Sequence, residues 1–174
     1  MPKLIKNGRL IDDSAEILVL DESQAPEALS LPAGPVFIPL AVWQAHKSAF
    51  SDRSDVGVWL DSHDNVEDLA PDLDDLSAIA LNFPKFTDGR AYSAAALLRS
   101  RYGFKGEIRA IGDVLRDQFF FMQRCGFDAI QPKAGKYSDA QLEESLASLK
   151  DFSAPYQAAV DQPEPLFRRA QRAA

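Results

Sequence analysis

Short apolar runs that alternate with helix-like patterns constrain the fold of this chain more than any other feature. Four runs of strand length occur between residues 56 and 130, and a polar loop and a helical pattern follow each of the last three. Alternation of this kind predicts an α/β protein with a parallel sheet and crossover helices. The four runs are 56–60, 79–83, 108–111 and 127–130.

Glycines and one capping pattern predict where the helices end and begin. Gly103 and Gly126 each follow an apolar stripe of helical spacing, and glycine is the usual residue just beyond a helix. Ser138 precedes Gln141 by three residues, which is the capping-box pattern and predicts a helix that begins there. Cys125 falls on the apolar face of its predicted helix, so a buried thiol is favoured over a nucleophile.

The first third of the chain predicts β structure ahead of these units. Asn7-Gly8 within residues 4–11 favours a tight hairpin, residues 17–21 suggest another short strand, and residues 36–38 begin a run that continues into a helix. We therefore expect an α/β fold with a small, mostly parallel sheet of βα units, preceded by a hairpin-rich N-terminal segment. Four clear strands are too few to close an eight-stranded barrel, which favours an open or half-barrel sheet.

Composition indicates one domain with an uneven distribution of charge. The 174 residues fit a single α/β domain over 1–160, and the lack of apolar periodicity over 161–174 predicts a loosely ordered C-terminal tail. The formal charge is −7, yet residues 83–136 hold ten Lys and Arg against five Asp and Glu. An acidic whole argues against a nucleic-acid or anionic membrane surface as partner, while a local anion site remains possible.

The sequence has no pattern typical of a membrane protein, a secreted protein, a metal site or a cofactor site. No run reaches the roughly 18 apolar residues of a membrane span, and the first residues lack the apolar stretch of a signal peptide, so we expect a cytoplasmic protein. His46 and His63 have no partners at metal-ligand spacing, which predicts no metal site. With one cysteine and no dinucleotide fingerprint, the sequence predicts no cofactor.

Charged residues concentrate in the loops that follow the predicted strands. Loops at the carboxyl ends of parallel strands form the ligand crevice of an α/β sheet, because helix N-termini converge there. One interpretation is a site for an anion or a partner; the other is that Asp88 and Asp113 are helix N-caps and that the charges pair with each other. Lys133 follows the last strand at the same edge. The candidate site residues are Lys85, Thr87, Asp88, Arg90, Asp113, Arg116 and Asp117.

Two long motifs resemble a known bacterial family of unknown function. They are NFPKFTDGRAYS over residues 82–93 and LLRSRYGFKGEIRAIGDVLRDQ over residues 97–118. Members of that family are usually encoded beside the haemoprotein subunit of assimilatory sulfite reductase and are labelled as probable oxidoreductases of sulfite reduction. The resemblance therefore implies a role in sulfur assimilation, with the sulfite reductase haemoprotein subunit as a partner. The motifs fall on the two loops that supply all seven candidate residues.

Three functional hypotheses follow. The first is an accessory protein of sulfite reduction that docks an acidic partner or handles an anionic sulfur species through its basic loops. The second is a cofactorless α/β enzyme that acts on a small phosphorylated or sulfonated substrate, with an Asp as base and an Arg as clamp. The third is a structural partner subunit without a ligand, in which the basic block is one face of an interface.

Overall fold

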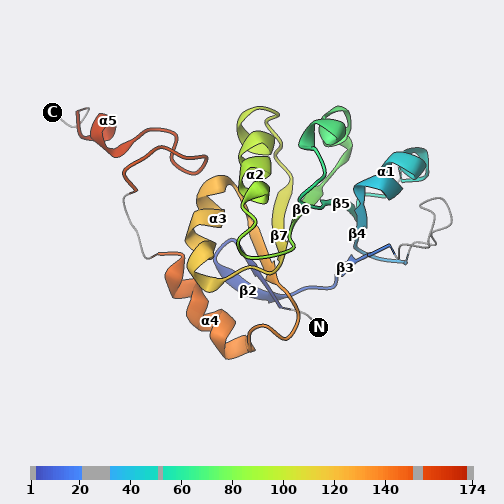
Figure 1. Ribbon diagram of the computed structural model, residues 1–174, viewed down its shortest axis with the longest axis horizontal. Coiled ribbons are helices and arrows are strands. Elements are labelled where there is room, and N and C mark those ends of the chain that lie inside the picture. Colours follow the sequence, from blue (N-terminus) through green and yellow to red (C-terminus); the bar gives the residue numbers. More distant parts are fainter. Residues whose placement is uncertain (1–2, 21–31, 51–52, 151–154, 172–174) are drawn as a thin grey trace.

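One curved sheet organises the molecule. The computed structural model describes residues 3–20, 32–50, 53–150 and 155–171, and Figure 1 shows the helices α2, α3 and α4 beside the sheet. The strand order is β2-β1-β8-β7-β6-β5-β4-β3. Strands β3 to β8 are parallel and lie in chain order, while β1 pairs antiparallel with both β2 and β8. The expected α/β fold with a mostly parallel sheet, open or half-barrel, after an N-terminal hairpin is confirmed, and the sheet is a half-barrel. The strands are β1 Lys3–Lys6, β2 Arg9–Asp12, β3 Glu16–Ile17, β4 Val36–Pro39, β5 Val56–Leu60, β6 Ala78–Phe83, β7 Glu107–Gly112 and β8 Ala129–Pro132.

The hairpin turn, the end of α3 and the start of α4 lie at the residues that the sequence predicted. Asn7 and Gly8 both have positive φ, at 50° and 72°, as the hairpin turn between β1 and β2 requires. Gly126 ends α3 with φ 105°, and the Ser138 hydroxyl accepts a hydrogen bond from the Gln141 amide at the start of α4. The helices are α1 Leu40–His46, η2 Lys47–Ala49, η3 Val66–Asp75, α2 Arg90–Ser100, η4 Arg116–Gln118, α3 Phe119–Cys125, α4 Asp139–Ser148 and α5 Leu166–Gln171.

The main core lies between the sheet and the helices. Consecutive parallel strands joined by crossovers of one hand place every connecting helix on the same face. Strand residues such as Ile79, Leu81 and Phe83 are essentially inaccessible there and belong to one core cluster with Leu98 of α2 and Met122 of α3. Burial of these apolar side chains is the main favourable term in the stability of the fold.

A second, smaller core fills the opposite, concave face of the sheet. Phe37, Ala80 and Ile111 are buried there, with Ile17 and Trp59 packed against them. The small Ala80 leaves room for larger neighbours, which is how barrel interiors are usually filled. The concave face is therefore a packed layer with little open space at its centre.

The chain between β2 and β3 shows how strongly the sheet curves. Asp12 and Glu16 are four residues apart, so they lie within about 14 Å of each other. The two strands are nevertheless the opposite edges of an eight-stranded sheet, which would be about 33 Å apart if it were flat. The segment between them passes over the concave face, where Asp13 forms a buried ion pair with Arg109 of β7 at 2.6 Å. Curvature thus brings the two edges close together.

The C-terminal residues contact the body of the protein through α3. The Val160 amide donates to the Arg124 carbonyl, and the Arg124 guanidinium donates to the Gln157 carbonyl. Beyond this contact α5 forms, with Phe167 about half exposed. The loose order of residues 161–174 stays a prediction, and residues 172–174 lie outside the part of the chain that the structure describes.

Candidate functional site

A cavity of about 670 Å³ lies where the half-barrel opens, at the carboxyl ends of β6, β7 and β8. Asn82, Ile111 and Gln131 stand side by side in register on these three strands and face its interior. Ile17 of the edge strand β3 lines the same cavity, because the sheet curves round to meet it. Cavities of this size at this end of a parallel barrel commonly bind small molecules. We call this cavity the mouth; its lining residues are Ile17, Asn82, Phe83, Pro84, Ile111, Gly112, Asp113, Gln131, Pro132, Lys133 and Ala134.

Asp113 is the carboxylate that lines the mouth, and it is already engaged. One of its oxygens pairs with the Lys136 ammonium, and the other accepts a hydrogen bond of 3.1 Å from the Phe86 amide. The expectation that Asp113 caps a helix is wrong, because the chain continues irregularly to Arg116 before η4 begins. The Lys136 ammonium, together with the Phe86 amide, holds the pKa of the Asp113 carboxyl below its ordinary value.

Replacing Lys136 with methionine is expected to return the pKa of Asp113 towards its ordinary value. A lowered folded-state pKa contributes stability above the unfolded-state pKa, and that contribution is lost as the pH falls through the folded-state value. The variant should therefore lose less stability than the wild type below about pH 4. NMR titration of the Asp113 carboxyl carbon measures the pKa directly, and an unchanged titration would show that Lys136 does not cause the shift.

Asp88 and Arg90 form a separate pair outside the mouth. The Arg90 guanidinium donates to both Asp88 oxygens, at 2.9 and 2.6 Å, and also to the Ser62 hydroxyl at 3.0 Å. This bidentate pairing strongly lowers the pKa of the Asp88 carboxyl. Asp88 also accepts a hydrogen bond from the Arg90 amide, but the N-cap of α2 is Gly89, so the alternative interpretation of Asp88 as an N-cap is wrong. Most of the N–H donors of the Arg90 guanidinium are therefore used in hydrogen bonds to other residues of this chain.

The remaining predicted residues lie on the outer loops. Arg116 interacts with Glu144 of α4 through its guanidinium, and its amide donates to the Tyr137 hydroxyl. Thr87 and Asp117 are exposed, and neither lines the mouth. The seven predicted residues are therefore divided among the mouth, the Asp88–Arg90 pair and the surrounding surface.

The arginines and lysines near the carboxyl ends of these strands are mostly paired with carboxylates, but two lysines are not. Lys133 lines the mouth, and its ammonium makes no ion pair with any residue that the structure describes, although its charge helps to lower the pKa of Asp113. Lys85 is exposed on the loop after β6 and also has no ion pair within the described ranges. The Lys133 ammonium, at the rim of the cavity and without an ion pair in the described part of the chain, is available to an external anion.

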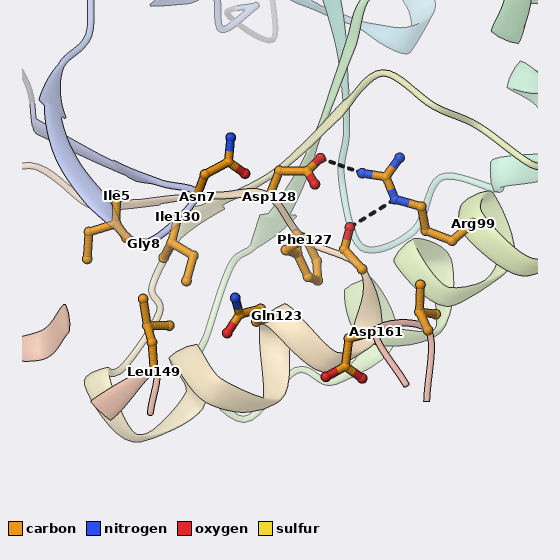
Figure 2. A pocket seen from close by; sticks show the side chains of 12 residues that line it. Ile5, Asn7, Gly8, Arg99, Gln123, Phe127, Asp128, Ile130, Leu149 and Asp161 are labelled. Carbon is orange, nitrogen blue, oxygen red and sulfur yellow. Dashed lines mark hydrogen bonds and ion pairs between the residues drawn. The ribbon is translucent and has the colours of Figure 1, made fainter. Parts of the chain in front are cut away.

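A smaller cavity of about 250 Å³ lies at the other end of the sheet, beside the hairpin turn (Figure 2). Arg99 lines this cavity. Its guanidinium donates to the carbonyls of Phe104, Gly106 and Gly126 and to the Asp128 carboxylate. These bonds satisfy the arginine and tie the loops before β7 and β8 together. Each charged side chain among the described lining residues has an ion-pair partner, so this cavity is a structural junction.

The residues that the structure describes form neither a metal centre nor a membrane span. Within them, no three or more His, Cys, Asp and Glu side chains gather closely enough to hold a metal ion. None of the helices in the described segments has the length and apolar character needed to cross a membrane. Burial raises the pKa of the Cys125 thiol, which makes the thiolate scarce at neutral pH.

The chain matches a known protein family. The model of a family described as "Bacterial protein of unknown function (DUF934)" matches residues 57–167. This chain belongs to the DUF934 family. A search of curated proteins finds no match. The DUF934 match runs from β5 into α5, so it contains every lining residue of the mouth except Ile17.

Sequence reasoning missed two polar residues of the mouth in this DUF934 chain. Asn82 and Gln131 lie near the ends of apolar strands, where their side chains face the concave side. A polar residue near the carboxyl end of a buried parallel strand was the available signal, since such positions open onto the ligand crevice. Of the seven loop residues predicted from their charge and position, only Asp113 lines the mouth.

Proposed function

We propose that this protein is an accessory protein of assimilatory sulfite reduction that holds an anionic sulfur species or an acidic partner group at the mouth. The observation that carries the proposal is Lys133, a cation on the rim of a cavity of about 670 Å³ with no ion pair among the described residues. Lys136 neutralises Asp113 beside it, so the local balance favours an anion. The association with sulfite reduction rests on the family resemblance of the motifs at residues 82–93 and 97–118.

The chemistry of the mouth favours binding over acid–base catalysis. A carboxylate that acts as a general base works best when its pKa lies near the working pH. Asp113 is the one carboxylate among the described lining residues, and Lys136 shifts its pKa in the opposite direction. The alternative of a cofactorless enzyme with an Asp as base therefore has less support than a binding role.

Replacing Lys133 with alanine is expected to weaken the binding of sulfite about tenfold or more, since a hydrogen bond to a charged group contributes about 1.5–3 kcal/mol. Isothermal titration calorimetry with sodium sulfite measures the affinity. Lys105→Ala is the matched control, because Lys105 is an exposed lysine on the loop before β7, away from the mouth. Equal affinities for the wild type and Lys133→Ala would contradict an anion site at the mouth.

The partner is tested in cells that use sulfate as their sulfur source. We expect the haemoprotein subunit of sulfite reductase to co-purify with the tagged wild-type protein and to be reduced in a Lys85→Glu/Lys133→Glu preparation. Deletion of the gene should slow growth on sulfate, and supplied sulfide should restore it. Normal growth of the deletion strain on sulfate would exclude a role in sulfite reduction.

A further inference from the structure

Gln131 presents a hydrogen-bond donor to the mouth because a bond from Arg109 fixes the orientation of its side-chain amide. The Arg109 guanidinium donates to the Gln131 amide oxygen at 3.0 Å, and a guanidinium can only donate. Arg109 is itself buried and held by Asp13 and Glu107. The oxygen of Gln131 must therefore face Arg109, which leaves the Nε2 donors of a residue that lines the mouth without a partner among the described residues.

Asn82 presents a hydrogen-bond acceptor instead, because a bond to Asp61 fixes the orientation of its side-chain amide. Its Nδ2 donates to an Asp61 carboxylate oxygen at 3.1 Å, and an ionised carboxylate can only accept. The Oδ1 of Asn82 therefore faces away from Asp61 and over Gly112, whose missing side chain leaves space for it: a Cβ at Gly112 would lie 2.5 Å from this oxygen. In the described structure this oxygen accepts no hydrogen bond.

The mouth thus combines two donors on the β8 side with one acceptor on the β6 side. The donors are Gln131 Nε2 and Lys133 Nζ, the acceptor is Asn82 Oδ1, and the side chain of Ile111 lies in register between Asn82 and Gln131. We propose that the ligand is a small organic anion, a sulfonate or carboxylate, that also carries a hydroxyl or amino group as a hydrogen-bond donor. This proposal rests on the proposed anion-binding function and names the class of ligand for that site.

The size of the cavity supports an organic skeleton between the two polar ends. A volume of about 670 Å³ lies within the usual range for small-molecule pockets, roughly 300–1,000 Å³, and far exceeds a bare oxyanion. Apolar walls from Ile17 and Ile111, with Pro84 and Pro132 at the rim, provide contact for a short carbon chain. The anion would lie against Lys133 and Gln131, and the donor would reach Asn82.

A matched pair of probes tests this assignment. Ethanesulfonate offers the anion alone, and 2-hydroxyethanesulfonate adds one hydroxyl to the same skeleton. By titration calorimetry, the wild type should bind the hydroxylated probe about fivefold more tightly, the effect of one hydrogen bond. Asn82→Ala should remove this preference, so that the variant binds the two probes with equal affinity. Gln131→Glu, which still accepts from Arg109, should weaken both probes about tenfold or more.

The outcomes separate this inference from the function on which it rests. If both probes bind equally to the wild type, and Lys133→Ala weakens both, the mouth is an anion site but the assignment of a donor-bearing ligand is wrong. If neither probe nor sulfite binds to the wild type, the anion site fails and the inference fails with it. A preference for the hydroxylated probe that persists in Asn82→Ala would also overturn the inference. Near-ultraviolet circular dichroism of each variant verifies that the fold is retained.

Discussion

Replacing Asp13 with alanine is expected to lower the free energy of unfolding by about 3 kcal/mol, because it leaves the buried Arg109 guanidinium short of one of its two carboxylates. The Arg109 and Asp13 side chains are only 6% and 9% exposed, and their charged atoms lie 2.6 Å apart. Glu107 remains as the second partner at 2.7 Å, which keeps the expected loss at the lower end for a broken buried pair. Urea denaturation followed by circular dichroism measures the change.

The neighbouring residue supplies the control for this variant. Asp12 pairs with Lys3 at 2.8 Å, but its side chain is 59% exposed. Asp12→Ala should therefore change the free energy of unfolding far less than Asp13→Ala does, because water screens this exposed pair. Adding Arg109→Met to Asp13→Ala should recover part of the loss, since no guanidinium that lacks one of its carboxylate partners then stays buried. Similar losses for the Asp12 and Asp13 variants would show that the segment between β2 and β3 is not held on the concave face by this pair.

Replacing Gly112 with alanine is expected to lower the free energy of unfolding by a comparable amount, about 3 kcal/mol. A Cβ there would lie 2.5 Å from both the Asn82 Oδ1 and the Phe83 carbonyl oxygen, and the backbone φ of 96° is unfavourable for any side chain. The strand end at the mouth would have to shift to relieve these contacts. Because Asn82 would move with it, the same variant should also reduce the preference of the mouth for 2-hydroxyethanesulfonate over ethanesulfonate.

Gly103 separates the two causes of that loss. Its φ of 67° is also positive, but a Cβ there meets nothing within 4 Å. Gly103→Ala should therefore lose only about 1 kcal/mol, the effect of backbone strain alone. Thermal or urea unfolding of both variants gives the comparison. Equal losses at the two positions would mean that the close approach of Asn82 and Phe83 to Gly112 contributes nothing.

Local signals account for the parts of the fold that the sequence predicted. The hairpin depends on Asn7 and Gly8, the end of α3 on Gly126, and the start of α4 on Ser138 and Gln141, and all of these act within a few residues of themselves. Alternation of strands and helices then implies a parallel sheet, because consecutive βα units pack in one direction. The short range of these interactions is the reason that they can be recognised in a single sequence.

Long-range contacts account for what could not be predicted. Asp13 and Arg109 are 96 residues apart, and nothing near either residue indicates that they form a pair. Asp113 resembled a helix cap because Gly112-Asp113 precedes an apolar run, but its partners Phe86 and Lys136 come from two other loops. The placement of Asn82 and Gln131 in the mouth likewise depends on the curvature of the whole sheet, which no short motif specifies.

NMR chemical-shift mapping with sulfite tests the central claim most directly. On titration of sodium sulfite into the ¹⁵N-labelled protein, the largest saturable shifts are expected at the amides of Gly112, Gln131 and Lys133, which surround the mouth. Amides around Arg99 and Asp128 at the opposite end of the sheet should stay unchanged. Shifts that centre on that opposite end, or no saturable shift anywhere, would contradict an anion site at the mouth of the half-barrel.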